Sequence, residues 1–292
     1  MPATISIVGA GRVGRALGRR LRSLGWTVGS VVTRTKPTAR AAVRAIGGGT
    51  AHAKLTRWVL ASDVVLISTP DDAMPAVAAT LAKIGGDEWH GKIVLHTSGA
   101  LDRTVLAPLA KRGAAVGSIH PLQTFSGRGL PRLAGVIFAV EGDRRAAATA
   151  RRIARALGGF AITIDGRNKP AYHAAGAFVA GHILAVAEGA TQILMALGFT
   201  RRRASRALLP LARQMLDNLE RLGPRAAWTG PLSRGDYCTI AKHASALGEF
   251  PREVQDAYAV LTRLGARLLA RNPEAALERL NNVLHKGRGG KS

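Results

Sequence analysis

A glycine-rich turn, Gly9-Ala10-Gly11-Arg12-Val13-Gly14, constrains the fold of this chain more than any other feature. Strand-forming residues precede it from Thr4, and apolar residues recur after it at helical spacing as far as Leu24. A strand, a turn of the pattern G-x-G-x-x-G and a helix, in this order, form the phosphate-binding unit of dinucleotide-binding proteins. The sequence therefore predicts that this turn holds the pyrophosphate of a dinucleotide at the N-terminus of a helix.

Further strand-like segments alternate with alanine-rich helical stretches along the first half of the chain. We expect strands at residues 26–33, 64–68, 93–97, 114–119, 136–140 and 160–164, and a helix at 144–157. Strands that alternate with helices form a doubly wound parallel sheet. From Lys169 onward the pattern is almost entirely helical. The predicted fold is α/β: a Rossmann-type parallel sheet in residues 1–165, an all-helical C-terminal domain in residues 166–286 and a disordered tail in residues 287–292.

The composition fits a folded protein in a reducing compartment. Hydrophobic residues make up 47% of the chain and charged residues 21%, as in ordinary globular domains. Cys238 is the only cysteine, which excludes an intrachain disulfide and a cysteine-based zinc site, and we expect no metal. The chain begins without a signal-peptide pattern, and no apolar run reaches the ~20 residues that cross a bilayer. We therefore expect a cytoplasmic protein with no membrane partner.

The formal net charge of +24 raises nucleic acid as a partner. The arginines, however, lie in short clusters on segments that are otherwise rich in Ala and Leu, which is typical of solvated helix faces. Aromatic residues make up only 4% of the chain, so platforms for stacking single-stranded bases are scarce. We do not expect a nucleic-acid partner, although a basic surface that binds one stays open as the weakest alternative.

The end of the second predicted strand indicates which dinucleotide binds. An acidic residue there would hydrogen-bond the ribose hydroxyl of NAD, but the segment 31–36 has none. Thr33, Arg34 and Thr35 instead offer hydroxyls and a cation, which suit a 2′-phosphate through charge-assisted hydrogen bonds. The predicted cofactor is therefore NADP(H). The alternative is that Arg34 is one more exposed arginine in an arginine-rich chain.

Two later strand ends carry small polar residues, Ser68-Thr69-Pro70 and Thr97-Ser98-Gly99. Ligands bind at the carboxyl ends of the strands in sheets of this kind. We expect Ser68, Thr69, Pro70 and Thr97 to border the nicotinamide ribose, and Ser98 and Gly99 to border the substrate. Small hydroxyl residues also cap helices, which is an equally good account of Thr69 and Ser98.

Four longer strings carry a family resemblance. They are His96-Thr-Ser-Gly-Ala-Leu, Ser118-Ile-His-Pro-Leu-Gln-Thr-Phe, Tyr172-His-Ala-Ala-Gly-Ala-Phe and Thr229-Gly-Pro-Leu-Ser-Arg-Gly-Asp. With them the chain resembles, over residues 4 to 285, Rossmann-like proteins that have a C-terminal domain of unknown function 2520. The resemblance implies an NADP-binding domain followed by a helical domain that often forms the dimer. It also implies kinship with pyrroline-5-carboxylate reductases, 6-phosphogluconate dehydrogenases and deazaflavin-dependent NADP oxidoreductases, and some members resemble ketopantoate reductases.

The chain departs from this family at one position. Where many relatives have Asn, this sequence has Gly181 followed by His182. If the Asn of the relatives binds substrate, either the contact is missing here or His182 supplies it.

Lys169 and His173 are four residues apart at the start of the first long helix, so they share a face. The spacing is similar to the Lys-x-x-x-Asn pair of related hydroxyacid dehydrogenases. We expect Lys169 to be the general acid or alkoxide stabiliser and His173 an orienting donor or alternate acid. Tyr172 lies about 100° around the helix from His173 and is the weaker candidate. The alternatives are a solvated lysine and a core histidine.

Three more polar side chains are candidates for substrate contact or catalysis. His120 follows a predicted strand, where an imidazole can donate to a substrate oxygen or serve as a structural histidine. Arg234 lies in the polar loop 229–236 and can bind a substrate carboxylate bidentately. Asp236 ends the same loop, where it either binds substrate or caps the next helix.

The predicted function is an NADPH-dependent oxidoreductase that reduces a small, anionic oxo or imino compound, with a 2-oxo acid such as ketopantoate as a candidate. A dinucleotide-binding sensor or regulator without turnover is the alternative from another class. The resemblance further implies a homodimer through the helical domain.

Overall fold

The computed structural model describes residues 4–286 of the chain, which forms two compact units divided between Ala180 and Gly181. Sequence analysis placed a domain boundary at residue 165. The structure assigns the following helix to the first unit as well, because Lys169 and His173 on it lie against Ser118 and Gly99 of that unit. The expected tail at 287–292 lies outside the described residues.

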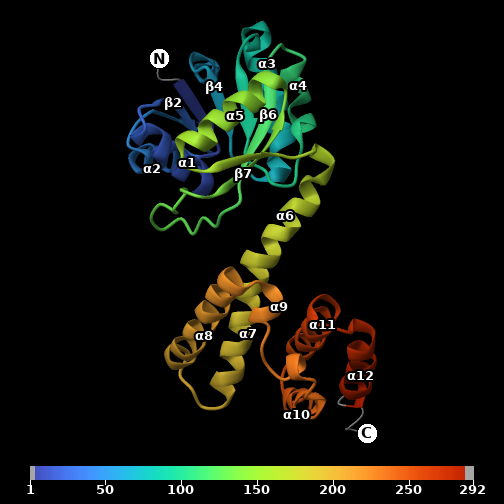
Figure 1. Cartoon of the computed structure of the whole chain (residues 1–292). Coiled ribbons are helices and arrows are strands. Elements are labelled where there is room, and N and C mark those ends of the chain that lie inside the picture. Colours follow the sequence, from blue (N-terminus) through green and yellow to red (C-terminus); the bar gives the residue numbers. More distant parts are fainter. Residues whose placement is uncertain (1–3, 287–292) are drawn as a thin grey trace. The chain divides into compact units, whose positions relative to one another are not determined.

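The first unit is built on one eight-stranded sheet in the order β3-β2-β1-β4-β5-β6-β7-β8 (Figure 1). The strands are β1 (Thr4–Val8), β2 (Thr27–Val32), β3 (Thr50–His52), β4 (Val64–Ile67), β5 (Ile93–His96), β6 (Ala115–Pro121), β7 (Ile137–Gly142) and β8 (Phe160–Thr163). In the centre of the sheet, Ile7 of β1 lies opposite Val31 of β2 and Leu66 of β4. The predicted α/β fold is confirmed, and β3 is a strand that was not predicted from the sequence.

Helices cover both faces of this sheet. One core packs the sheet against α1 (Arg12–Ser23), α2 (Lys36–Ile46) and α5 (Arg144–Ala156), and the other packs it against α3 (Met74–Gly85) and α4 (Ala107–Ala110). Successive side chains of a strand point to opposite faces. Along β4, Val64 and Leu66 accordingly enter the first core, while Val65 and Ile67 enter the second.

One pair of strands departs from the expected parallel sheet. β6 and β7 are antiparallel, with Ile119 opposite Val140. A parallel pair needs a crossover connection, usually a helix, and residues 122–136 between these two strands form none. The predicted parallel sheet therefore contains one antiparallel pair. β7 and β8 are parallel again, with α5 as their crossover.

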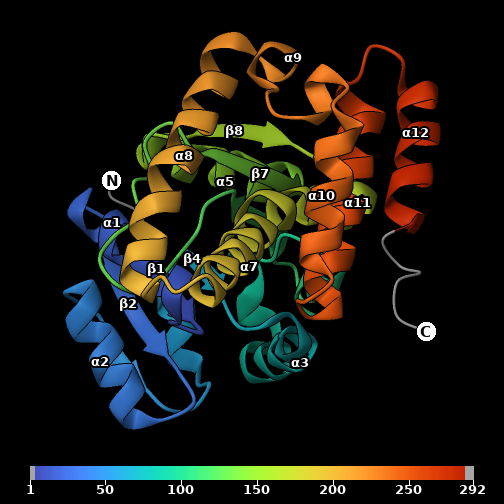
Figure 2. The same cartoon turned by 90° about the horizontal axis from the view of Figure 1, so that it is seen from below.

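The second unit is helical, as predicted. It contains α7 (Ile183–Ala196), α8 (Arg201–Leu222), α9 (Pro224–Ala227), α10 (Tyr237–Leu247), α11 (Arg252–Leu269) and α12 (Pro273–Lys286). α10, α11 and α12 lie together (Figure 2) around Ile240, Ala266 and Leu280, all fully or almost fully buried. α7 and α8 form a hairpin in which Thr191 and Ala204 are the only buried residues.

One helix among the described residues is long and apolar enough to cross a membrane by length and composition. It spans Gly166–Ala196 and includes α6 (Lys169–Ala177), a π-helical turn (Phe178–His182) and α7; a window of 18 residues within it has a mean hydropathy of 1.4. Sequence analysis found no such segment because it looked for an unbroken apolar run. The helix begins inside the folded first unit, where Lys169 is fully buried. The part beyond Ala180 is shorter than the ~20 residues a bilayer requires.

Candidate active site

The glycine-rich turn has the geometry that a dinucleotide requires. Gly9 has a φ of 84° and donates its N–H to the Val32 carbonyl at 2.9 Å. A Cβ on Gly9 would lie 2.7 Å from the backbone nitrogen of Thr69, and one on Gly14 would lie 3.0 Å from the Gly9 oxygen. Only glycine fits at Gly9, and any larger residue at Gly14 would be tightly packed. The turn brings β1 directly into α1 beside the end of β4, as the sequence predicted.

Two observations fit a bound dinucleotide at this turn. Gly11 is the N-cap of α1 and provides no side-chain cap, so the N–H groups of the first turn are free to bind a ligand. A Cβ on Gly11 would have no neighbour nearer than 3.9 Å, which leaves the backbone open to approach. In addition, the hydroxyl of Thr69 is buried without a hydrogen-bond partner among the described residues. A ribose or phosphate oxygen would satisfy it.

Hydroxyls surround the end of β2 and the start of α2. The Thr33 and Thr38 hydroxyls are 2.7 Å apart, and Thr35 caps α2 by accepting from the Thr38 N–H. Lys36 is bound to the Ala51 carbonyl at 3.0 Å. Arg34 is exposed and forms no ion pair within residues 4–286. An anion at the N-terminus of α2 would meet this guanidinium and the positive end of the helix dipole.

Ser98 and His96 hold the loop after β5 in place. The Ser98 hydroxyl donates to an Asp71 carboxylate oxygen at 2.8 Å and accepts from the N–H groups of Ala100 and Leu101 at 3.1 and 2.9 Å. A hydroxyl has one proton and two acceptor sites, so these contacts fill its capacity. His96 is fully buried and accepts from the Ser98 N–H at 3.2 Å. Burial, helped by the charge of Lys169, lowers the pKa of His96 to about 3.

Three segments converge on His120 at the end of β6. Its Nδ1 lies 3.0 Å from the Tyr172 hydroxyl, and its ring packs edge-on against both Tyr172 and His173, with 5.5 Å between ring centroids in each pair. A Cβ on Gly99 would lie 2.8 Å from His120 Nε2 and would also collide with His173. Burial, with smaller contributions from His173 and Lys169, lowers the pKa of His120 to about 4. The ring is therefore neutral at physiological pH.

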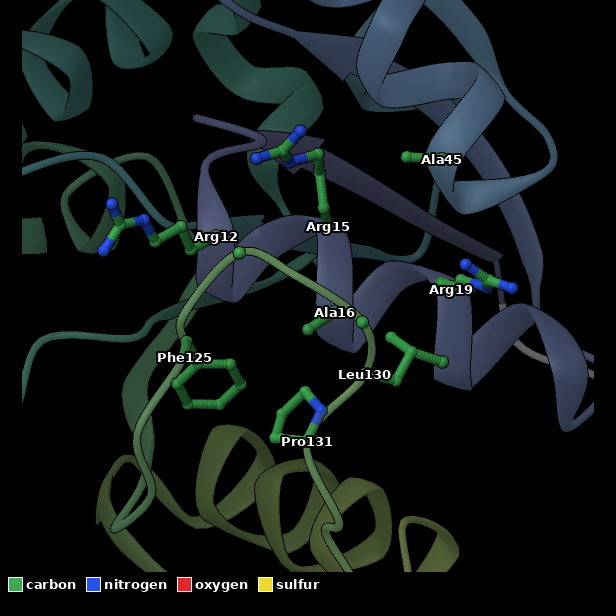
Figure 3. Close-up of a pocket in the computed structure, with 10 residues that line it drawn as sticks. Arg12, Arg15, Ala16, Arg19, Ala45, Phe125, Leu130 and Pro131 are labelled. Atoms are coloured by element: carbon green, nitrogen blue, oxygen red, sulfur yellow. The ribbon is translucent and has the colours of Figure 1, made fainter. Parts of the chain in front are cut away.

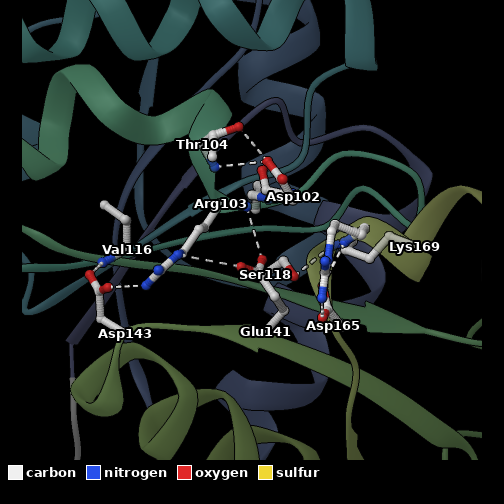
Figure 4. Close-up of polar contacts among 11 residues, drawn as sticks. Asp102, Arg103, Thr104, Val116, Ser118, Glu141, Asp143, Asp165 and Lys169 are labelled. Atoms are coloured by element: carbon white, nitrogen blue, oxygen red, sulfur yellow. Dashed lines mark hydrogen bonds and ion pairs between the residues drawn. The ribbon is translucent and has the colours of Figure 1, made fainter.

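Lys169 takes part in a network of polar contacts around Ser118 (Figure 4). Its side chain is fully buried, and its ammonium donates to the Ser118 hydroxyl at 2.6 Å. Burial lowers the pKa of Lys169 to about 8, against the opposing charges of Glu141, Asp102 and Asp71. Burial likewise raises the pKa of Glu141, which accepts from the Arg103 N–H at 2.9 Å. Lys169 is thus a buried cation and not a solvated residue of the first helical turn.

A separate cavity of about 110 Å³ lies beside α1 (Figure 3). Its lining combines three arginines of α1 with apolar residues, mostly from the β6–β7 loop: Arg12, Arg15, Arg19, Ala16, Ala45, Phe125, Gly127, Gly129, Leu130 and Pro131. The guanidinium groups of Arg12, Arg15 and Arg19 point in different directions in the close-up. They do not converge on one ligand atom, so we do not include this cavity in the candidate site.

The remaining predicted residues belong to the second unit. Asp236 caps α10, accepting from the Thr239 N–H at 3.0 Å and the Thr239 hydroxyl at 2.7 Å. These hydrogen bonds hold the pKa of Asp236 below its usual value. Arg234 is exposed in the preceding turn, and His182 is exposed in the π-helical turn. Asp236 therefore makes the helix-capping contacts that were the alternative to substrate binding.

Tyr172 lies closer to the site than its angular distance from His173, its neighbour in the chain, predicted. Tyr172 is also three residues after Lys169, and residues three apart on a helix are neighbours on its surface. That spacing was a signal that Tyr172 faces the sheet. Its contact with His120 could not be predicted, because it depends on where β6 ends relative to α6.

Comparison with known proteins identifies the fold. Residues 2–121 match a Rossmann-like domain, and residues 136–264 match the domain of unknown function 2520. Together the two matches confirm the resemblance stated from the sequence. Among curated proteins, none matches the sequence significantly.

Several solved structures share the fold over nearly the whole chain. A Bacteroides fragilis protein assigned as an NADP oxidoreductase has a TM-score of 0.74 at 22% identity, covering 90% of this chain and 97% of its own. The reductive aminase of Aspergillus terreus, in complex with NADPH and ethyl-5-oxohexanoate, has a TM-score of 0.67 at 21% identity, with coverages of 91% and 94%. A pyrroline-5-carboxylate reductase of Coxiella burnetii has a TM-score of 0.57 at 15% identity, with coverages of 99% and 98%. The chain therefore has the fold of NADP-dependent oxidoreductases.

Proposed function

This chain combines a Rossmann-like domain with a domain of unknown function 2520, and from that combination we propose that it is an NADPH-dependent oxidoreductase acting on a small imino or oxo compound. One observation carries the proposal: the glycine-rich turn after β1 and the imidazole cluster after β5 and β6 lie at the same carboxyl edge of one sheet. β1, β4, β5 and β6 are neighbours in it. Ligands bind at this edge in doubly wound sheets.

Different residues around the turn bind different parts of the dinucleotide. Gly9 to Gly14 and the N-terminus of α1 hold the pyrophosphate, and Thr69 supplies a hydroxyl that lacks a partner without it. Arg34, with the hydroxyls at the start of α2, binds the 2′-phosphate through charge-assisted hydrogen bonds. Bound NADPH would supply a hydride for the carbon of the substrate.

At the substrate end, the chain provides hydrogen bonds and a fixed charge. His120 is neutral and donates a hydrogen bond to the heteroatom of the substrate, with His173 beside it. Lys169, which sequence analysis favoured as the acid, acts from the network around Ser118, where its charge adds to burial in lowering the pKa of the neighbouring imidazoles. Ser98 orders the loop on which Gly99 makes room for both imidazoles.

We propose a C=N bond as the first substrate class to test and a C=O bond as the second. The solved structures of the same fold include a reductive aminase, an imine reductase and a pyrroline-5-carboxylate reductase, and their names point to imines. The 2-oxo acids, ketopantoate among them, stay in the second class.

We further propose that a second copy of the chain covers the apolar faces of the second unit. On α8, Leu211, Met215, Leu219 and Leu222 recur at helical spacing and are all exposed, Leu211 by 69%. On α11, Val260, Leu264 and Leu268 repeat the pattern. Exposed apolar surface of this extent is uncommon on a monomer. The family resemblance supports pairing through these helices.

Cofactor choice is tested by titrating the protein with NADPH and with NADH. We expect NADPH to bind more tightly, and Arg34→Ala to weaken NADPH binding about tenfold, since a charge-assisted hydrogen bond contributes about 1.5–3 kcal/mol. NADH binding should not change. Arg40→Ala, which removes another exposed arginine of α2, is the matched control and should leave both affinities alone. Equal affinities, or a preference that survives Arg34→Ala, would contradict the proposal.

Turnover is tested by following NADPH consumption with cyclic imines, with amine–ketone mixtures and with 2-oxo acids. Consumption with any of these supports the reductase. Tight NADPH binding with no consumption across the whole panel would favour the sensor without turnover.

A further inference from the structure

The two nitrogens of His120 have different surroundings. Nδ1 faces the Tyr172 hydroxyl at 3.0 Å, and the two rings meet edge-on at 87°. Nε2 points the other way, over Gly99, where a Cβ would lie only 2.8 Å from it. A neutral imidazole carries one proton, so one nitrogen donates and the other accepts. Which nitrogen donates decides whether His120 offers the substrate a hydrogen-bond donor or an acceptor.

The Tyr172 side chain can make this choice. Burial raises the pKa of Tyr172 to about 12, so the phenol keeps its proton throughout the physiological range. The hydrogen-bond partner of this hydroxyl among the described residues is His120 Nδ1. A partly buried phenol proton needs an acceptor, and an unprotonated imidazole nitrogen is a strong one. The favoured arrangement is therefore Tyr172 O–H donating to His120 Nδ1.

We propose that Tyr172 is a positioning residue that fixes neutral His120 with its proton on Nε2, aimed at the heteroatom of the substrate. Only the role of His120 toward a substrate rests on the reductase function proposed above. The hydrogen bond between Tyr172 and His120 does not depend on that function. The orientation of a histidine is commonly set by the partner of its other nitrogen. Here that partner comes from α6, the same helix that brings His173 to the cluster.

This arrangement restricts the substrate. A neutral imidazole that donates from Nε2 polarises a group with a free lone pair, as neutral histidines do for carbonyl oxygens in other enzymes. A carbonyl oxygen or an unprotonated imine nitrogen meets this requirement. A protonated iminium has no lone pair to accept the hydrogen bond. The inference therefore favours a ketone, an aldehyde or a neutral imine as the form that meets His120.

Nitrogen-15 NMR of the histidine side chains tests the tautomer directly in the full chain, without substrate. A His120→Asn variant identifies the His120 signals by their loss. We expect wild-type His120 to be the Nε2–H form with a hydrogen-bonded Nδ1. In Tyr172→Phe, the Nδ1 signal should move to its unbonded position and the Nδ1–H form should become populated. The pKa of His120 should rise, because a hydrogen bond to the neutral form disfavours the charged one; His173 and Lys169 also face this ring and are unchanged.

A similar pair in the second unit provides the matched control. His243 Nδ1 lies 2.9 Å from the Tyr258 hydroxyl, with the rings edge-on at 80°. Tyr258→Phe should change the signals of His243 and leave those of His120 as they are. A wild-type His120 protonated on Nδ1, or a His120 that does not respond to Tyr172→Phe, would overturn the proposal. The wild-type measurement decides the tautomer even if Tyr172→Phe folds poorly.

Kinetics separate this inference from the proposed function. With a substrate in hand, Tyr172→Phe should lower kcat/KM about tenfold, the effect of about 1.4 kcal/mol, while the Kd for NADPH stays the same. Tyr258→Phe should not change kcat/KM. If no substrate is found but the NMR result holds, the proposed function fails and the tautomer assignment stands. If turnover is found and the NMR result fails, the reverse is true.

Discussion

Lys169 shows how one buried charge influences the protonation of its neighbours. The side chain is fully buried beside Ser118. Its charge adds to the effect of burial on the pKa of His96 and, after His173, on that of His120, which fall to about 3 and about 4. Both imidazoles are therefore neutral wherever the protein is expected to work. A neutral ring has one donor and one acceptor nitrogen, whereas a charged ring has two donors and no acceptor.

The burial of Lys169 should make stability depend on pH. The unfolded chain holds this proton up to about pH 10.5, whereas the folded protein holds it only up to about pH 8. Between these values unfolding takes up a proton, so raising the pH stabilises the fold. The separation corresponds to about 3 kcal/mol. We expect the free energy of unfolding, measured with urea, to rise from pH 8 toward pH 10 relative to that of Lys169→Met.

Lys111→Met is the control for this measurement, because Lys111 is exposed at the end of α4. Its curve of stability against pH should run parallel to the wild-type curve. If the Lys169→Met curve also runs parallel to the wild-type curve, the pKa of Lys169 is the same in the folded and unfolded chains. That result would contradict the assignment of Lys169 as a buried cation.

At the scale of elements, the sequence predicted most strands, because apolar runs bounded by turn residues carry that information locally. β1, β4 and β5 are examples, each with a buried run such as Val64–Ile67. The direction of β7 was not predictable from its own residues, since it depends on the loop at 122–136 that returns the chain without a helix. β3 is too short, at Thr50–His52, to show a period of two.

The candidate site was predictable only in part, for a related reason. The glycine-rich turn is contiguous in the chain, so its spacing alone identified it. The cluster of Gly99, His120, Tyr172 and His173 is assembled from β5, β6 and α6, and no local pattern shows that these residues meet. The hydrogen bonds of the Ser98 hydroxyl within its own loop were likewise not predictable, because one of them is made to Asp71, which is distant in sequence.

The carboxylate of Asp236 either caps α10 only or also binds a ligand, and two substitutions distinguish these roles. It caps α10 through Thr239, and removing such a cap costs about 1 kcal/mol. We expect Asp236→Ala to lower the free energy of unfolding by about that amount, measured by chemical denaturation. Asp236→Asn should retain most of the stability, because Asn is an equally good N-cap.

The Asn variant separates the two roles that sequence analysis left open. If Asp236 only caps α10, Asp236→Asn should leave KM for an active substrate unchanged. A rise in KM in Asp236→Asn without a loss of stability would mean that the carboxylate also contacts the substrate.

At the scale of the whole molecule, the charge is unevenly distributed along the chain. No Asp or Glu precedes Asp63, so every charged residue in the segment from β1 to α2 is a cation. The first 62 residues contribute 11 of the 24 net positive charges, and the anionic dinucleotide is proposed to bind in this segment. A field of one sign raises the local concentration of an oppositely charged ligand and speeds its association, and salt weakens the effect. Cofactor capture thus gives the basic surface a role that requires no nucleic acid.

The apolar faces of α7, α8 and α11 predict the oligomeric state. Large side chains on them are exposed, including Leu184 by 71% and Leu211 by 69%, while the core of the second unit lies among α10, α11 and α12. We expect light scattering to give twice the chain mass of 30.6 kDa. Leu211→Glu should shift the mass toward that of one chain, because a carboxylate would have to be buried in the interface without a partner.

Leu130→Glu is the matched control, since it places the same charge at an exposed leucine in the first unit. It should keep the mass of two chains. If the wild-type protein is a single chain that sediments with lipid vesicles, the apolar faces meet a membrane and not a second copy. That result would overturn the proposal of a second copy. Loss of vesicle binding in Leu211→Glu would then place α8 in the surface that meets the membrane.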